Sequence, residues 1–391
     1  MNGIVKNLTV FLFSLLFPIS LFAGEARVSV LTCSPGNEVY SLFGHTGLRY
    51  CNKEKGVDLV FSYGYFDFDA PGFVWRFVLG ETDYLVGAVP YDYFLAEYNG
   101  RGSRVVEQVL SLGEREKEEI YNRLVINCRA ENRKYRYNYF YNNCTTRIRD
   151  LVMQVSGAVV PGGGNTATFR GTLGVLTAGH PWYSFGIDLL LGAEVDEPAS
   201  QASLEFIPGN FMQSLAAAKV QLPGGVETPL VTEEHVLVNG VEPVVERNNL
   251  TPFNVSLLLL LLTLVVMLCE VRSRRTYWGY DILLMLLQGL SGALLLFMAL
   301  FSQHPAVGCN WLLLLLNPLA LLLLPLLVRS IVKHKKPLVA WVQVFFVVAF
   351  FVSAILQLQV YPAPIYFCAT ALLVRSLFHV YKDRICELTH F

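Results

Sequence analysis

The chain has 391 residues, of which 53% are hydrophobic and 16% charged, whereas globular proteins average roughly 45–50% and about 25%. Its net charge of −1 and its 13% aromatic residues exclude a basic polyanion-binding protein and a disordered chain. A mean hydropathy of +0.44 therefore indicates a protein that spends part of its length in a membrane.

An apolar run near the N-terminus predicts that the next segment is exported. Lys6 precedes residues 8–22, which are almost wholly apolar, and the small residue Ala23 follows. This pattern is typical of a secretory signal peptide, here residues 1–23. The alternative is an uncleaved anchor. Both interpretations export residues 24–250, a segment long enough to bury its own core.

The exported segment has a mixed pattern of strands and helices. Alternating apolar residues predict strands over 27–32, 46–51 and 57–68. A charged helix is expected over 114–130, because Ile120, Leu124 and Cys128 recur on one helical face. Residues 158–250 follow as an accessory region, and within it we assign no role to Asp188.

A second helix is expected to begin at Cys144. The alternating tyrosines before it predict an extended strand that contains Tyr135, Tyr137, Tyr139 and Tyr141. Asn142 and Asn143 then supply side chains that can cap a helix. Apolar residues continue at helical spacing until Gly157, which ends the helix.

Charged residues nearly vanish beyond residue 250. Asp281 is the only one between Arg275 and Arg329. A membrane-spanning helix needs about 20 apolar residues. The sequence therefore predicts a domain over 253–385 with five spans, near 253–270, 279–301, 311–328, 338–359 and 363–381. Asp281 lies close enough to one end of its span to snorkel to the interface.

The cations of this region predict its orientation. They follow the first and third spans and lie at the end of the fifth, as Arg272, Arg274, Arg275, Arg329, Lys333, Lys335, Lys336, Arg375, Lys382 and Arg384. The connections 302–310 and 360–364 contain no Lys or Arg. Because basic loops stay in the cytoplasm, we expect a cytoplasmic C-terminus and an exported segment before Phe253.

The exported segment contains Cys33, Cys51, Cys128 and Cys144. Cys33 and Cys51 bracket a predicted hairpin, and in an oxidising compartment they either pair or stay free. No metal-binding spacing, phosphate-binding glycine loop or basic aromatic surface occurs. We therefore expect no metal, no cofactor and no nucleic-acid partner.

Cys144 is the candidate nucleophile. A helix N-terminus favours a thiolate and offers N–H groups to the oxyanion of an acyl intermediate. The alternative for any cysteine is a small buried apolar residue, which is the preferred interpretation of Cys128. Asn143, Thr145 and Arg147 flank the nucleophile and are candidates for substrate binding.

A thiolate nucleophile needs a base, and the exported segment offers His45, His180 and His235. We favour His45, because Gly44 and Gly47 leave room around it and it enters a predicted strand. A third polar group should orient its imidazole. The candidates, which the sequence does not rank, are Glu38, Tyr63 and Asp67.

The order of these elements resembles a known family. A histidine on an early strand and a later cysteine that opens a helix resemble the circularly permuted papain-like (NlpC-type) fold. More closely, PGNEVYSLFGHTGLRY, FSYGYFDF, YNYFYNNCTTRIRD, HPWYSFGIDLLLG and the five-span tail resemble Lnb-type lipoprotein N-acyltransferases. The resemblance implies an α+β periplasmic thiol domain, an all-α membrane domain and residence in the bacterial inner membrane. Ser62 departs from the Asn expected there, so it receives no role.

The resemblance also implies the reaction. Cys144 would take an acyl chain from a membrane phospholipid with His45 as base, and pass it to the α-amine of a diacylated lipoprotein. Phospholipid, lipoprotein and the lipid bilayer are the expected partners. His304 and Asn310 lie in a loop on the same side of the membrane, where they either meet a lipid head group or cap a helix.

Two other classes of function remain open at this stage. One is a papain-like hydrolase, either a cell-wall amidase or peptidase or a lipid esterase. The other is a non-catalytic membrane sensor or assembly protein. The five predicted spans weigh against a wall amidase, and the Cys144 and His45 pair weighs against a non-catalytic protein.

Overall fold

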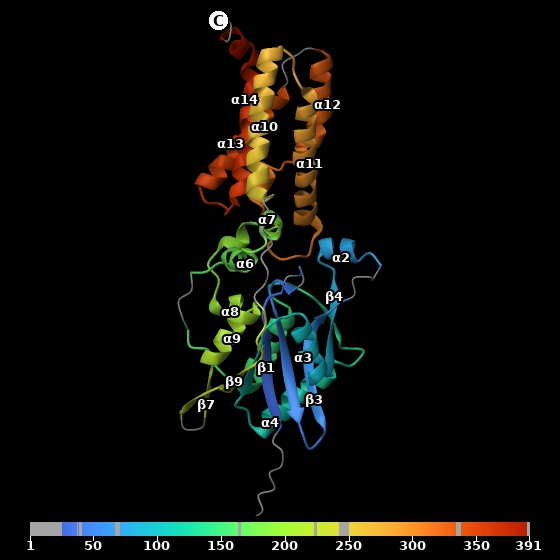
Figure 1. The fold of residues 1–391 in the computed structure, drawn as a ribbon, viewed down its shortest axis with the longest axis vertical. Helices are drawn as coiled ribbons and strands as arrows, with labels where there is room; N and C mark the ends of the chain where they lie inside the picture. The colour runs from blue at the N-terminus through green and yellow to red at the C-terminus, as the bar shows by residue number, and fades with distance from the viewer. Residues whose placement is uncertain are drawn as a thin grey trace, which may run out of the picture.

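The computed structural model describes residues 26–36, 38, 41–66, 71–162, 166–222, 225–241, 250–333 and 338–388. The predicted signal peptide of residues 1–23 lies outside them. Up to residue 241 the described chain forms a mixed domain of strands and helices, and five apolar helices follow it (Figure 1). This confirms the predicted fold class of an α+β domain followed by an all-α membrane domain.

The mixed domain is built on a seven-stranded antiparallel sheet in the order β6-β4-β3-β2-β1-β5-β9. Its strands are β1 (Arg27–Cys33), β2 (His45–Asn52), β3 (Val57–Tyr65), β4 (Asp83–Pro90), β5 (Val105–Leu110), β6 (Lys134–Arg136) and β9 (Val231–Val238). A separate hairpin joins β7 (Lys219–Gln221) and β8 (Glu227–Pro229). The three strands predicted before residue 70 are all present.

Helices cover both faces of the sheet. On one face α4 (Glu114–Asn127), α5 (Cys144–Ser156) and α9 (Pro208–Ala217) bury the main apolar core, in which Ile120, Leu124 and Ile148 are fully buried. On the other face α3 (Tyr91–Gly100) covers a smaller core around Phe94 and Tyr98. Because α5 packs on β2 and β3, its first turn lies beside the start of β2.

The predicted tyrosine strand is wrong beyond Arg136. Only Lys134–Arg136 forms β6. The Asn138 side chain accepts hydrogen bonds from the backbone N–H groups of Phe140 and Tyr141, so it turns the chain out of the extended conformation. The tyrosines that follow Arg136 are thereby gathered around the start of α5.

A disulfide between Cys33 and Cys51 does not form. In the register of β1 with β2, Cys33 stands opposite His45 and Cys51 stands opposite Arg27, at the two ends of the pair. Six residues of strand span about 20 Å, which exceeds the reach of a disulfide. Both thiols are free.

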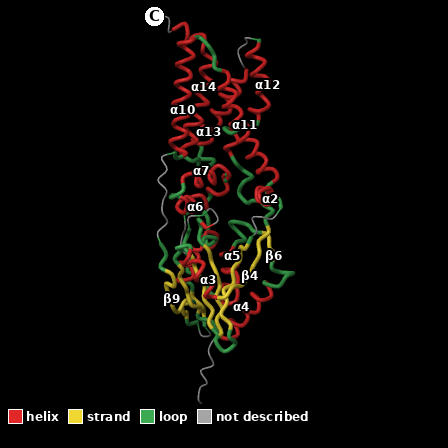
Figure 2. Tube along the Cα trace, turned by 45° about the vertical axis from the view of Figure 1, so that its right-hand side comes forward, coloured by secondary structure: helices red, strands yellow, loops and turns green. Residues whose placement is uncertain are grey.

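The membrane domain contains the five predicted spans. They are α10 (Pro252–Ser273), α11 (Trp278–Phe301), η3 (Trp311–Leu314) with α12 (Leu319–Val332), α13 (Leu338–Ile355) and α14 (Ala363–Leu388) (Figure 2). The third span is interrupted, since Asn317 accepts a hydrogen bond from the Leu319 N–H and Pro318 is the N-cap of α12. A Cβ on Gly292 of α11 would collide with the Leu316 carbonyl, so only glycine permits this close approach.

Asp281 does not snorkel to the interface, contrary to the prediction. Its carboxylate is buried and accepts hydrogen bonds from Arg375 Nε at 2.6 Å and Nη2 at 2.9 Å. His379 lies 3.0 Å away, and Arg375 also reaches the buried Glu270 at 2.7 Å. These charges satisfy one another and join α10, α11 and α14.

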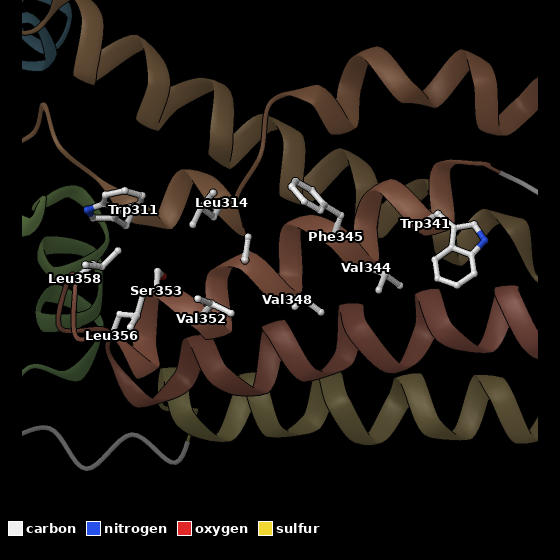
Figure 3. A pocket seen from close by; sticks show the side chains of 11 residues that line it. Trp311, Leu314, Trp341, Val344, Phe345, Val348, Val352, Ser353, Leu356 and Leu358 are labelled. Atoms are coloured by element: carbon white, nitrogen blue, oxygen red, sulfur yellow. The ribbon is translucent and has the colours of Figure 1, made fainter.

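An apolar groove of about 620 Å³ runs along the outside of the membrane domain (Figure 3). It extends over α13 from Trp341 to Val352, and Trp311 and Leu358 close its end. The hydroxyl of Ser353, which is part of the lining, is already hydrogen-bonded to the Phe350 carbonyl and the Tyr361 hydroxyl. Such a lining suits contact with lipid chains.

Short helices occupy the junction between the two domains. They are α2 (Phe73–Leu79), α6 (Phe169–Thr177), α7 (Pro181–Leu190) and η2 (Ala193–Asp196), and α8 (Gln201–Leu204) lies farther from the bundle (Figure 1). In both views α2 and α7 lie between the sheet and the helical bundle (Figures 1 and 2). The C-terminal end of α14 is at the opposite end of the bundle.

Candidate active site

Cys144 is the first residue of α5, as predicted. Asn143 is the N-cap, and its Oδ1 accepts hydrogen bonds from the N–H groups of Thr145 and Thr146, both at 2.9 Å. Its Nδ2 donates to the carbonyls of Tyr139 and Phe206. The buried Asn143 therefore fixes the start of the helix, and Phe206 ties the accessory region to that point.

The start of β2 brings His45 to the Cys144 thiol. Burial alone would raise the pKa of Cys144, but the charge of His45 and a hydrogen bond between the two side chains hold that pKa below its ordinary value. Hydrogen bonds from the Thr46 N–H and from Thr145 act in the same direction. Thr46 Oγ1 also lies 3.1 Å from Thr145 Oγ1, which links the strand to the helix. The arrangement increases the share of Cys144 that is thiolate at a given pH.

The other three cysteines of this domain, all within the described residues, have the opposite shift. Burial raises the pKa values of Cys33, Cys51 and Cys128. Cys128 is half-buried like Cys144, and burial still raises its pKa. Cys33 is buried, and its hydrogen bond with Tyr98 does not offset its desolvation. Burial therefore does not distinguish Cys144 from the other thiols. The neighbouring His45 distinguishes it, because His45 lowers the pKa of Cys144.

Tyr98 of α3 is a site residue that the sequence did not reveal. Its ring stacks on the His45 imidazole, with centroids 6.2 Å apart and planes inclined by 12°. Tyr98 is itself buried against Phe94. It thus restrains the imidazole from the face of the sheet opposite α5.

The other two candidate bases, His180 and His235, have contacts away from Cys144. His180 is the residue before the first turn of α7, and its ring lies near Tyr183. His235 on β9 is exposed and contacts Glu233 at 2.9 Å. Of the three candidates, His45 is the one in contact with Cys144.

The three candidate orienting groups have different positions. Glu38 is exposed, and its backbone forms a turn with Ser41. The Tyr63 hydroxyl accepts a hydrogen bond from Asn127 Nδ2 at 2.8 Å, so it is directed toward α4. Burial raises the Tyr63 pKa, which leaves it a neutral phenol. Asp67 lies outside the described residues.

Tyrosine rings surround the thiol. Burial raises the pKa values of these phenols, and the charge of Cys144 raises them further. They are Tyr84, whose pKa rises to about 12, and Tyr135, Tyr137 and Tyr139. The hydroxyls of Tyr135 and Tyr139 are buried and have no hydrogen-bond partner among the described residues.

Two family models match the chain. Residues 21–170 match the Lnb N-terminal periplasmic domain, and residues 245–384 match the Lnb transmembrane domain. The chain belongs to the Lnb-type family. The Lnb domains indicate the lipoprotein N-acyltransferase type, and they identify a multi-pass membrane protein whose N-terminal domain is periplasmic. No curated protein and no solved structure matches.

The residues that flank Cys144 in the Lnb periplasmic domain have different surroundings. Thr145 is fully buried, and its hydroxyl contacts that of Thr46. The side chain of Asn143 is fully used by the hydrogen bonds that cap α5 and by those to the Tyr139 and Phe206 carbonyls. Arg147 Nε donates to Asn142 at 2.6 Å, and its guanidinium lies 4.6 Å from the centre of the Tyr135 ring. Arg147 is half-buried and also lines a pocket of about 380 Å³.

The two Lnb domains are joined by the loop that carries His304 and Asn310. His304 Nε2 donates to the Phe77 carbonyl of α2 at 2.6 Å, and Asn310 Nδ2 donates to the Leu189 carbonyl of α7 at 2.7 Å. Asn310 Oδ1 also caps η3. Both side chains therefore hold the periplasmic domain on the outer end of the bundle.

Asp188 has a structural partner in the same region. Arg170 reaches Asp188 at 3.1 Å and Asp196 at 2.6 Å, and it donates to the carbonyls of Leu191 and Gly192.

Among the described residues no group of three or more His, Cys, Asp or Glu side chains is arranged to hold a metal ion.

Proposed function

We propose that this Lnb-type protein moves an acyl chain from a membrane phospholipid to the α-amine of a diacylated lipoprotein through a Cys144 thioester. His45 takes the thiol proton as sulfur attacks the ester carbonyl. The carbon–sulfur bond forms, the ester carbon–oxygen bond breaks, and His45 returns the proton to the departing lysophospholipid oxygen.

The second half of the reaction reverses these roles. The lipoprotein amine attacks the thioester, a carbon–nitrogen bond forms and the carbon–sulfur bond breaks. His45 removes a proton from the amine, and the thiolate of Cys144 is restored. The product is an N-acylated, triacylated lipoprotein, and the kinetics are ping-pong.

One observation carries this proposal. Cys144 has a pKa lowered by His45, whereas burial raises the pKa values of Cys33, Cys51 and Cys128. Nucleophilic catalysis by cysteine requires this combination of a thiolate and an adjacent base. His45 precedes Cys144 in the chain, which is the order expected of a permuted papain-like domain.

The tetrahedral oxyanion needs hydrogen-bond donors beside Cys144. The Asn143 cap occupies the N–H groups of Thr145 and Thr146, so the N–H of Cys144 lies outside the cap. The Tyr139 hydroxyl is buried without a hydrogen-bond partner among the described residues, and its pKa responds to the charge of Cys144. We assign these two groups to the oxyanion.

The location of the site suits substrates that are anchored in the bilayer. The periplasmic domain is hydrogen-bonded to the outer end of the five-helix bundle, and the C-terminal end of α14 lies at the other end (Figure 1). We therefore place the protein in the inner membrane with its C-terminus in the cytoplasm. Residues 24–250 form the periplasmic unit and 253–385 the membrane unit.

The competing function is hydrolysis, in which water replaces the amine. The test supplies purified full-length enzyme in vesicles with phospholipid and a diacylated lipopeptide, and measures the products by mass spectrometry. Transfer predicts acylated lipopeptide, and acyl-enzyme on Cys144 when the acceptor is omitted. Free fatty acid as the sole product, with the lipopeptide unchanged, would identify a hydrolase.

A further inference from the structure

A short apolar helix of the periplasmic domain lies against the membrane domain. In α2, the apolar side chains Val74, Trp75 and Phe77 are 74%, 59% and 48% exposed. The Trp75 ring nevertheless packs on Phe297 of α11, with centroids 5.2 Å apart. The exposed apolar surface of α2 is thus continuous with that of a membrane-spanning helix.

Phe297 gives the depth of this contact. It lies four residues before Phe301, the last residue of α11. Since a helix rises 1.5 Å per residue, Trp75 lies about 6 Å below the outer end of that span. Apolar side chains at this depth contact acyl chains, and tryptophan prefers the interface. The apolar side chains of α2 therefore contact the outer leaflet of the bilayer.

A series of aromatic rings continues from α2 into the periplasmic domain. Phe77 lies 6.1 Å from Phe73, and Phe73 lies 6.1 Å from Phe66, just beyond β3. Phe66 stacks on Tyr84 at 5.0 Å, and Tyr84 stacks on Tyr137 at 4.1 Å. We call these five residues the aromatic row.

The aromatic row ends beside the nucleophile. The charge of Cys144 acts on both Tyr84 and Tyr137. Gly64, two residues before Phe66, has a φ of +107°, and a Cβ there would lie 3.9 Å from the Cys144 Cβ. The end of β3, next to Phe66 of the aromatic row, thus lies close to Cys144.

We propose that the aromatic row binds the acyl chain of the donor phospholipid and leads it from the outer leaflet to Cys144. Phe66, Phe73 and Tyr137 are half-buried, so each retains a surface that a hydrocarbon chain can cover. Covering such rings is favourable through the hydrophobic effect. This inference rests on the proposed function and adds the site where the acyl chain lies.

The first test measures binding without turnover. Full-length Cys144→Ser protein is placed in phosphatidylethanolamine and phosphatidylglycerol vesicles that contain a phospholipid with a diazirine in its acyl chain. Crosslinked residues are then found by peptide mass spectrometry. We expect crosslinks at α2 and also at Tyr84 or Tyr137. Crosslinks confined to the five membrane spans would overturn the proposed acyl-chain site at the aromatic row, whatever the activity of the enzyme.

The second test separates chain binding from chemistry. Wild-type protein, Phe73→Glu and the control Tyr93→Glu receive either dipalmitoyl phosphatidylethanolamine in vesicles or soluble dihexanoyl phosphatidylethanolamine. Tyr93 lies on α3 and is 74% exposed, so its replacement controls for added surface charge. Acyl-enzyme on Cys144 is measured by mass. Phe73→Glu should lose roughly tenfold or more with the long-chain donor and little with the short one.

The outcomes distinguish the two proposals. Equal losses with both donors, or no loss with either, would overturn the aromatic row as an acyl-chain site. If wild-type protein forms no acyl-enzyme with either donor, the proposed function fails, and the crosslinking result alone decides the aromatic row. Crosslinks at α2 alone would support an anchoring helix in place of the complete row, and would overturn the proposal.

Discussion

The imidazole of His45, at the first position of β2, is hydrogen-bonded to the thiol of Cys144, at the first position of α5. The strand and the helix are held together one residue farther on, where the side chains of Thr46 and Thr145 meet. The proposed catalytic pair is therefore positioned by the packing of two regular elements, which is more rigid than placement by loops.

The first prediction concerns the pH dependence of Cys144 reactivity. His45 lowers the Cys144 pKa against the effect of burial, so His45→Ala removes the lowering influence and leaves the desolvation. The pKa of the thiol then rises, and less thiolate is present at neutral pH. Iodoacetamide labelling of Cys144 should move to higher pH, and acyl transfer should fall by about 10²–10⁴-fold.

His180→Ala is the matched control for this experiment, because His180 precedes α7 and its ring lies near Tyr183. Its labelling profile should coincide with that of wild-type protein. An unchanged profile in His45→Ala would show that this histidine does not activate the thiol.

The second prediction concerns the Tyr139 hydroxyl. Tyr139→Phe keeps the ring and removes a buried hydroxyl that has no hydrogen-bond partner among the described residues. Removing an unsatisfied polar group does not destabilise a fold, so Tm should stay equal or rise. If the hydroxyl stabilises the oxyanion, kcat should fall by roughly 10²–10³-fold.

The control is Tyr121→Phe, since Tyr121 stacks on Tyr50 and packs edge-on against Phe61 in the core. It should retain wild-type kcat. A normal kcat in Tyr139→Phe would remove this residue from the oxyanion site, whereas a lowered Tm would indicate a structural role.

The third prediction concerns the buried charges of the membrane domain. Arg375→Leu leaves Asp281 and Glu270 buried without their main cation. Removing one partner of a buried ion pair costs about 3–5 kcal/mol. The bundle should therefore unfold at lower denaturant concentration in detergent. Arg329→Leu replaces an exposed arginine near the end of α12 and should have little effect. Equal stability of the two variants would contradict the assigned role of this network.

The sequence was informative where the controlling interactions are local. Asn143 caps the helix that it immediately precedes, so the position of Cys144 could be predicted from its neighbours. Five apolar stretches likewise identify five spans, because the length of a span is fixed by the thickness of the bilayer. His45 could be favoured over the other histidines from the strand that it begins.

Contacts between distant residues could not be predicted. Asp281 is neutralised by Arg375, which lies 94 positions along the chain. Tyr98 reaches His45 only because α3 packs on the sheet opposite α5. The tyrosine alternation failed for a different reason. The Asn138 side chain competes for backbone N–H groups that a strand would have used.

The central claim is that Cys144 carries an acyl group from phospholipid to lipoprotein. The most direct measurement expresses the full chain in cells that lack their own N-acyltransferase and weighs the N-terminal peptides of lipoproteins by mass spectrometry. We predict N-acylated, triacylated peptides with wild-type protein, and diacylated peptides alone with Cys144→Ser at equal membrane abundance. Triacylated peptides in the presence of Cys144→Ala would contradict the account, as would diacylated peptides alone with correctly inserted wild-type protein.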